Sequence, residues 1–174
     1  MFGLFISIIS MGQEGTAIWN LYASPLATKS LFRAKLVAPL LVSLIPAIAL
    51  PIAVSLIFSF TPMWSIALFS SSLVLCTLAV FIGNYLAPKY MDLEEKPRNA
   101  YIRGTGMMLG FLELVACGLA VMLPFIFYVF WREYALSIGV TSTMAILMSA
   151  AIGIALMEVF YRLAFGSMKK VSLE

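Results

Sequence analysis

Two carboxylates are the residues of this sequence best placed to do chemistry, because both lie inside long hydrophobic stretches. They are Glu113 and Glu158. An ionised side chain near the bilayer centre costs roughly 3 kcal/mol on insertion scales, so such a residue usually has a partner or a watery cavity. Arg162 follows Glu158 by one helical turn, which favours a structural ion pair. Glu113 has no basic residue three or four positions away, and three interpretations stay open: it is protonated, it pairs with another helix, or it lines a route.

No other catalytic constellation is present in the sequence. The chain has no histidine, which removes most haem, zinc and copper chemistry, so we expect no metal site and no cofactor. It also has no Gly-x-x-x-x-Gly-Lys-Ser/Thr phosphate loop and so does not bind ATP by that route. Intramembrane aspartyl chemistry would need a pair of buried acids, and only Glu113 and Glu158 are available. A membrane enzyme that uses Glu113 is therefore the weakest of the functions considered.

The composition defines the elements that position these residues. Hydrophobic residues make up 63% of the chain and charged residues only 11%, whereas a soluble domain carries about a quarter charged residues. The sequence therefore predicts an all-α, polytopic transmembrane helix bundle in a single domain. The net charge of +3 does not indicate nucleic acid, because the basic residues lie between spans. Cys76 and Cys117 fall inside hydrophobic runs, as small packing residues do, and predict no disulfide framework.

Four full spans are predicted, at residues 36–60, 64–87, 105–131 and 135–160. Residues 1–11 are apolar but shorter than the roughly 20 residues that a spanning helix needs. The simplest explanation is the tail of a span, with Met1 a fragment boundary or a truncated gene start; a half-inserted interfacial segment is the alternative. The first full span contains three prolines, each of which removes a backbone hydrogen bond and offers a hinge. These are Pro39, Pro46 and Pro51.

The basic residues predict the orientation. Ten of the eleven Lys and Arg residues fall on one side of the predicted spans, and only Arg132 falls on the other. This asymmetry assigns the ten-residue side to the cytoplasm. The segment 13–35, the loop Pro88–Gly104 and the tail 161–174 are then cytoplasmic. We expect a protein of a prokaryotic cytoplasmic membrane with a cytoplasmic C-terminus.

The polar segment 13–35 reads as two short helical pieces at the membrane surface. Ile18, Leu21 and Tyr22 form one apolar stripe, and aromatic residues settle at the membrane–water boundary. Ser24-Pro25 breaks the first piece and restarts the helix, since Ser caps and Pro fits the first turn. The second piece is basic and leads into the first full span.

Small residues in the spans predict close helix contacts. Gly106-x-x-x-Gly110, Ala116-x-x-x-Ala120 and Ser149-x-x-x-Gly153 each allow two backbones to approach. Ser70-Ser71-Ser72 is either a packing feature or a hydrophilic patch on a pathway.

The surface segment resembles the cytoplasmic coupling helix of ABC-2 type transporter permeases. The resemblance rests on Glu14-Gly15-Thr16, the run through Trp19 and Leu21, Ser24-Pro25-Leu26, and Ala34-Lys35 before a span. The region from Gly83 to Gly110 is also similar, although the short turn before the last span departs from members with re-entrant helices there. The resemblance implies that one group of residues contacts an ATPase subunit. That group is Glu14, Gly15, Trp19, Leu21, Ser24, Pro25 and Lys35.

The function implied is a membrane-spanning permease subunit of an ABC exporter, with membrane lipid around it. Its expected partners are a separate ATP-binding subunit and a second permease copy or half. Closure of the ATPase dimer would be converted into tilting of the spans. A non-transporting membrane scaffold or assembly protein is the alternative, and in that case segment 13–35 is an amphipathic anchor only.

Overall fold

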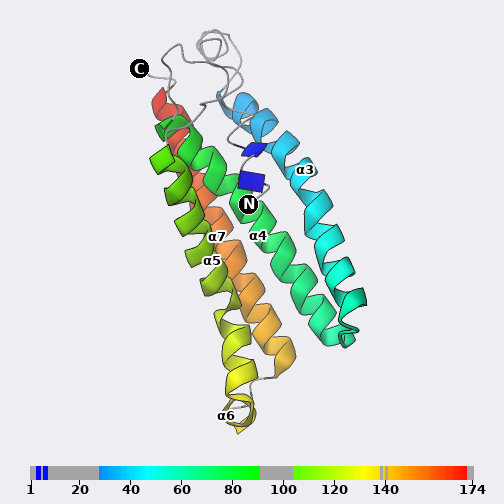
Figure 1. Ribbon diagram of the computed structural model, residues 1–174. Coiled ribbons are helices and arrows are strands. Elements are labelled where there is room, and N and C mark those ends of the chain that lie inside the picture. Colours follow the sequence, from blue (N-terminus) through cyan, green and yellow to red (C-terminus); the bar gives the residue numbers. More distant parts are fainter. Residues whose placement is uncertain are drawn as a thin grey trace.

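The computed structural model describes residues 3–4, 6–7, 28–90, 104–137, 139 and 141–171, and within these ranges the chain is helical with no β-strand. The named helices are α3 (Thr28–Ile57), α4 (Pro62–Tyr90), α5 (Gly104–Phe130), α6 (Arg132–Ser137) and α7 (Ser142–Val171). The four long helices form a bundle, and the short α6 lies at one end of it (Figure 1). The predicted all-α bundle is confirmed.

The long helices have the length and surface of membrane spans. Each of α3, α4, α5 and α7 contains an apolar stretch of 26 to 29 residues, more than the roughly 20 needed to cross the hydrocarbon core. Large apolar side chains point away from the bundle, as the exposed fractions of Leu41 (61%), Leu56 (74%) and Leu147 (64%) show. A soluble monomer rarely exposes so much contiguous apolar surface, whereas lipid accepts it. The chain is an integral membrane protein.

The first span begins earlier than expected. α3 runs without interruption from Thr28 to Ile57, so the described part of the second predicted helical piece is continuous with the span, and its place at the membrane surface stays a prediction. Nothing between Thr28 and Pro39 breaks a helix, and adding residues to an existing helix is favourable. Arg33 and Lys35 therefore lie in the same helix as the apolar stretch.

The last span begins later than expected. The prediction of a span from Ala135 is wrong, because α6 ends at Ser137 and α7 starts at Ser142. Gly139 has a φ of +79°, a left-handed conformation typical of a residue that follows a helix. The Thr141 Oγ1 then accepts a hydrogen bond from the Met144 N–H at 3.3 Å, as an N-cap does.

Helix α4 is the centre of the bundle and contacts α3, α5 and α7. One buried cluster joins it to α5, α7 and the N-terminal segment through Leu4, Leu78, Ala79, Ile82, Leu86, Cys117, Val121 and Phe160. A second cluster joins it to α3 and α7 through Phe32, Leu36, Ala87 and Ala164. Because α4 is covered from three directions, it fixes the relative positions of the other helices.

The described residues of the N-terminal apolar stretch lie inside the bundle. Leu4 is 4% exposed and belongs to the first cluster. Ser7 is fully buried, and its Oγ donates a hydrogen bond to the Val80 carbonyl oxygen of α4 at 3.1 Å. This segment therefore packs on α4 as a further helical element.

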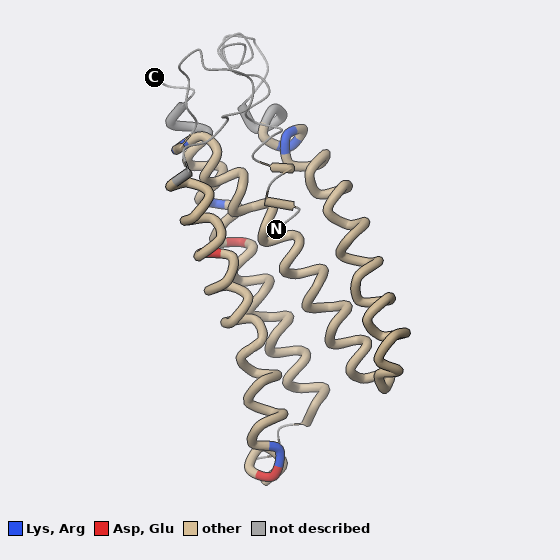
Figure 2. Tube along the Cα trace, in the orientation of Figure 1, with Lys and Arg blue, Asp and Glu red and all other residues tan. Residues whose placement is uncertain are grey.

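Apart from the acidic residues part-way along α5 and α7, most charged residues of the described chain lie toward the two ends of the bundle, as the coloured positions in Figure 2 show. Arg33 and Lys35 lie in the first turns of α3, and Lys89 lies in the last turn of α4, at the same end. Arg132 and Glu133 lie at the opposite end, in α6. This separation is the pattern from which the orientation was predicted; which end is cytoplasmic stays a prediction.

Candidate membrane-embedded site

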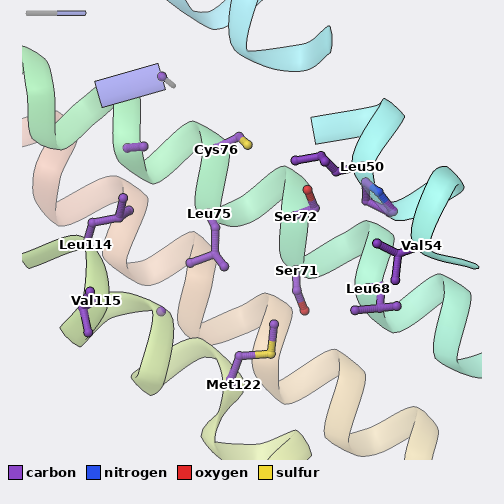
Figure 3. Close-up of a pocket in the computed structure, with 14 residues that line it drawn as sticks. Leu50, Val54, Leu68, Ser71, Ser72, Leu75, Cys76, Leu114, Val115 and Met122 are labelled. Carbon is purple, nitrogen blue, oxygen red and sulfur yellow. The ribbon is translucent and has the colours of Figure 1, made fainter. Parts of the chain in front are cut away.

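A cavity of about 460 Å³ lies between α3, α4 and α5. Leu50, Val54 and Pro51 of α3 form one wall, and side chains of α5 face them across α4 (Figure 3). The other lining residues are Gly3, Leu68, Ser71, Ser72, Leu75, Cys76, Ala79, Leu114, Val115, Gly118 and Met122. The volume lies within the range of about 300 to 1,000 Å³ that is usual for ligand pockets.

The floor of this cavity carries the hydroxyl groups of Ser71 and Ser72. They follow the start of α4 at Pro62 by about 14 Å at 1.5 Å per residue, which is near the middle of a bilayer core. Ser71 is only 8% exposed, and its hydroxyl has no hydrogen bond to any described residue. Ser72 forms a side-chain hydrogen bond with Cys76. Polar residues inside spans usually face the bundle interior or a cavity, as these two serines do, and both the packing and the pathway interpretation fit this position.

The N-terminal segment closes one end of the cavity. A Cβ added to Gly3 would lie 3.0 Å from Val80 Cγ2, 3.1 Å from the Cys76 carbonyl oxygen and 3.3 Å from Ser43 Cβ. A Cβ added to Gly83 would lie 2.8 Å from Ser7 Cβ and 3.0 Å from the Leu4 carbonyl oxygen. Glycine at these two positions allows the segment to approach α4 at backbone distance.

Glu113 lies beside the cavity and not in it. Its neighbours Leu114 and Val115 line the cavity, whereas Glu113 does not. Its Oε2 is buried and has no hydrogen-bond partner among the described residues. The cation that acts on it electrostatically is Lys89 of the neighbouring helix α4, outside the i±4 window that sequence reasoning considered.

Lys89 itself lies over two aromatic rings. Its Nζ is 5.7 Å from the centroid of Tyr85 and 5.6 Å from that of Tyr90, within the range of a cation–π contact. A basic residue at the end of a span is usually held at the interface by its long side chain. Lys89 therefore acts on the carboxyl group of Glu113 through its charge, without a hydrogen bond or a salt bridge between the two side chains.

The second intramembrane carboxylate has the partner expected from the sequence. The Arg162 Nε donates to the Glu158 Oε1 at 2.7 Å, and both side chains are more than half exposed. No described contact joins Glu158 to Glu113, so the structure does not bring the two acids together as a catalytic pair. Among the described residues no group of three or more His, Cys, Asp or Glu side chains could hold a metal ion.

Sequence reasoning missed Asn84, and it named Ser149 only as a small residue at a helix contact. Asn84 is fully buried, and its Nδ2 donates to the Val80 carbonyl oxygen at 2.9 Å, the same oxygen that accepts from Ser7. The Asn84 Oδ1 and the Ser149 Oγ are buried without a hydrogen-bond partner among the described residues. A single Asn within an apolar stretch was the available signal, because polar residues in spans are costly and usually have a role.

Some of the remaining predicted residues lie in α3, and the others lie outside the described part of the chain. The three prolines lie inside α3, where Pro39 and Pro51 are buried and Pro51 lines the cavity. The coupling residues Glu14, Gly15, Trp19, Leu21, Ser24 and Pro25 lie outside the described residues. Lys35 is half-exposed in α3.

The predicted small-residue contacts are partly present. A Cβ at Gly153 of α7 would lie 2.4 Å from Val74 Cγ1, and one at Gly110 would lie 2.9 Å from Leu86 Cδ1. Ala116 is exposed, so that motif does not form a helix contact. The two cysteines are free, as expected.

Comparison with known proteins adds no relative: no protein-family model, curated protein or solved structure matches the chain. The fold and the site therefore stand on the geometry alone. That geometry is an integral membrane bundle of long helices around α4, with a cavity near mid-membrane whose floor carries two hydroxyl groups.

Proposed function

We propose that this chain is the membrane-spanning permease subunit of an ABC exporter and works with a separate ATP-binding subunit. The observation that carries the proposal is the cavity between α3, α4 and α5. It combines apolar walls with hydroxyl groups near mid-membrane, which suits an amphipathic substrate that crosses the bilayer. A scaffold has no need of such a space.

The position of α3 supports a gating role. α3 packs mainly on α4, and its Pro51 lies in the cavity wall. A proline removes one backbone hydrogen bond of the helix and makes bending there less costly. Bending at Pro46 or Pro51 would widen or narrow the cavity, and α3 begins at Thr28, within the predicted coupling segment 13–35.

A second copy or half of the permease would complete the path. The cavity is bounded on three sides by α3, α4 and α5, and the large apolar side chains of α3 remain exposed beside it. In ABC-type assemblies two membrane units work with two ATPase subunits, so the fourth wall is assigned to the second unit.

The test is co-purification with an ATPase. The tagged full chain is extracted from its native membrane in mild detergent, and the partners are identified by mass spectrometry. An ATPase with a phosphate-loop motif should be recovered, and Trp19→Ala should lower its recovery, since loss of an aromatic anchor costs roughly 2 kcal/mol or about 30-fold in affinity. Trp131→Ala, at the end of the bundle where α6 lies, is the matched control and should leave recovery unchanged.

Two results would argue against the proposal. Absence of any ATPase from the wild-type preparation would favour the scaffold, with segment 13–35 an amphipathic anchor. Equal recovery with Trp19→Ala and Trp131→Ala would remove segment 13–35 from the interface.

A further inference from the structure

A second pocket, of about 320 Å³, lies at the end of the bundle where α6 is found. It is formed where the α3–α4 turn and the start of α4 meet the end of α5, the start of α6 and the start of α7. Its lining residues are Thr61, Met63, Trp64, Phe125, Tyr128, Val129, Arg132 and Ser142. It is separate from the mid-membrane cavity, with which it shares no lining residue.

One wall of this pocket is a rigid aromatic surface. The rings of Trp64 and Phe125 meet edge to face, with centroids 4.9 Å apart and planes at 90°. Phe60 extends this surface along Trp64, at a centroid distance of 6.4 Å. Aromatic residues at the ends of spans lie at the level of the lipid headgroups and upper acyl chains. The pocket is therefore at headgroup depth.

The charged residue of the pocket is Arg132. It is the first residue of α6 and is exposed. Within the described part of the chain, no carboxylate lies within ion-pair distance of its guanidinium group, and the adjacent Glu133 is not among the pocket residues. A guanidinium group presents a planar set of donors that matches the oxygens of a phosphate group.

Hydroxyl groups converge on the same space. Thr61, Tyr128 and Ser142 all line the pocket. The Ser142 Oγ has only the sulfur of Met63 as a partner, at 3.8 Å, and thioether sulfur is a weak acceptor. This hydroxyl can exchange that contact for a phosphate oxygen at little cost.

We propose that this pocket binds the headgroup of an anionic phospholipid. The phosphate oxygens accept hydrogen bonds from Arg132 and from the hydroxyls of Thr61 and Ser142, and the upper acyl chain lies against the Trp64–Phe125 surface. A free phosphate ion would use the same donors but would leave the aromatic wall unused. The site does not depend on an ATPase partner, and so it stands or fails separately from the proposed transport function.

Native mass spectrometry of the delipidated full chain tests the site. Dioleoylphosphatidylglycerol should bind roughly tenfold more tightly than dioleoylphosphatidylcholine, because both carry the phosphate group but the choline ammonium of the second lipid cancels its net charge and is repelled by Arg132. Arg132→Gln should abolish this preference. Arg162→Gln removes a cation at the other end of the bundle and should preserve it. Inorganic phosphate in large excess should displace dioleoylphosphatidylglycerol only partly.

Equal binding of the two lipids, or an unchanged preference in Arg132→Gln, would overturn the proposal. Complete displacement of the bound lipid by inorganic phosphate would also overturn it, because the pocket would then be a site for a free anion. If Arg132→Gln does not give a folded protein, a Thr61→Ala, Ser142→Ala double variant replaces it. That variant should reduce the preference severalfold, and an unchanged preference would again overturn the proposal.

Discussion

Helix α4 has two sides that differ in packing. Toward α7 the helices meet closely: Val74 lies over Gly153, and the ring of Phe81 meets that of Tyr161 at 6.0 Å. Toward α3 and α5 the surface of α4 is Ser71, Ser72 and Cys76, and a cavity remains. Because lipid is as apolar as the hydrophobic side chains of the bundle, hydrophobicity alone does not decide which helix surfaces pack closely, and small residues such as Gly153 allow the close approach. The comparison shows a closely packed α4–α7 interface, whereas the second half of α3, at Leu50, Pro51 and Val54, borders a cavity.

The largest effect is expected from filling the closed side. Gly153→Ala puts a methyl group 2.4 Å from the stiff side chain of Val74 and should destabilise the protein by about 1 to 3 kcal/mol. Gly118→Ala, on the cavity side, meets Leu75 Cδ2 at an ordinary 3.5 Å and should leave stability unchanged. Thermal unfolding of both variants in detergent measures the difference. Equal melting temperatures would show that the two sides are packed alike.

A smaller effect is expected where the N-terminal segment closes the cavity. Gly83→Ala brings a methyl group 2.8 Å from Ser7 Cβ and should push the segment away from α4 at a cost of roughly 1 kcal/mol. The measurement is maleimide labelling of Ser7→Cys in a background with Cys76→Ala and Cys117→Ala.

Ser7 is fully buried, so the cysteine should be protected in the parent and labelled after Gly83→Ala. Gly166→Ala is the control, because a Cβ there meets nothing within 4 Å. Labelling that is equally fast in the parent would mean that the segment does not seal the cavity.

The smallest effect on stability is expected at Glu113, which is followed in sequence by the cavity residues Leu114 and Val115. Its Oε2 has no hydrogen-bond partner among the described residues, so Glu113→Gln should change the free energy of unfolding by less than about 0.5 kcal/mol. Glu158→Gln breaks an exposed ion pair with Arg162 and should cost about 0.3 to 0.5 kcal/mol.

Under the proposed function, Glu113→Gln folds normally but changes transport-coupled ATP hydrolysis, whereas Glu158→Gln does not. Chemical unfolding and ATPase assays of the two variants side by side distinguish these roles. A large loss of stability in Glu113→Gln would instead make this residue structural.

The spans could be predicted from the sequence because long apolar stretches carry their own signal, and the Glu158–Arg162 pair because both residues lie on one helix. The start of α7 could not, since apolar residues continue through Ala135 and Leu136, and the break between α6 and α7 contains Gly139 with a positive φ, which the hydrophobic pattern does not reveal. The cavity and the unpartnered Asn84 could not either, because they depend on which side of α4 each neighbour covers. Lys89 was missed as the cation near Glu113 for the same reason.

The hydrogen bond between Ser7 and Val80 joins residues 73 positions apart and has a consequence for biogenesis. At about 5 to 20 residues per second, the ribosome needs roughly 4 to 15 seconds between synthesis of the two partners. During that interval the Ser7 hydroxyl and the backbone around Gly3 lack their partner on α4. The segment around Ser7 can therefore reach its final position only after the α4 residues that it contacts have been made.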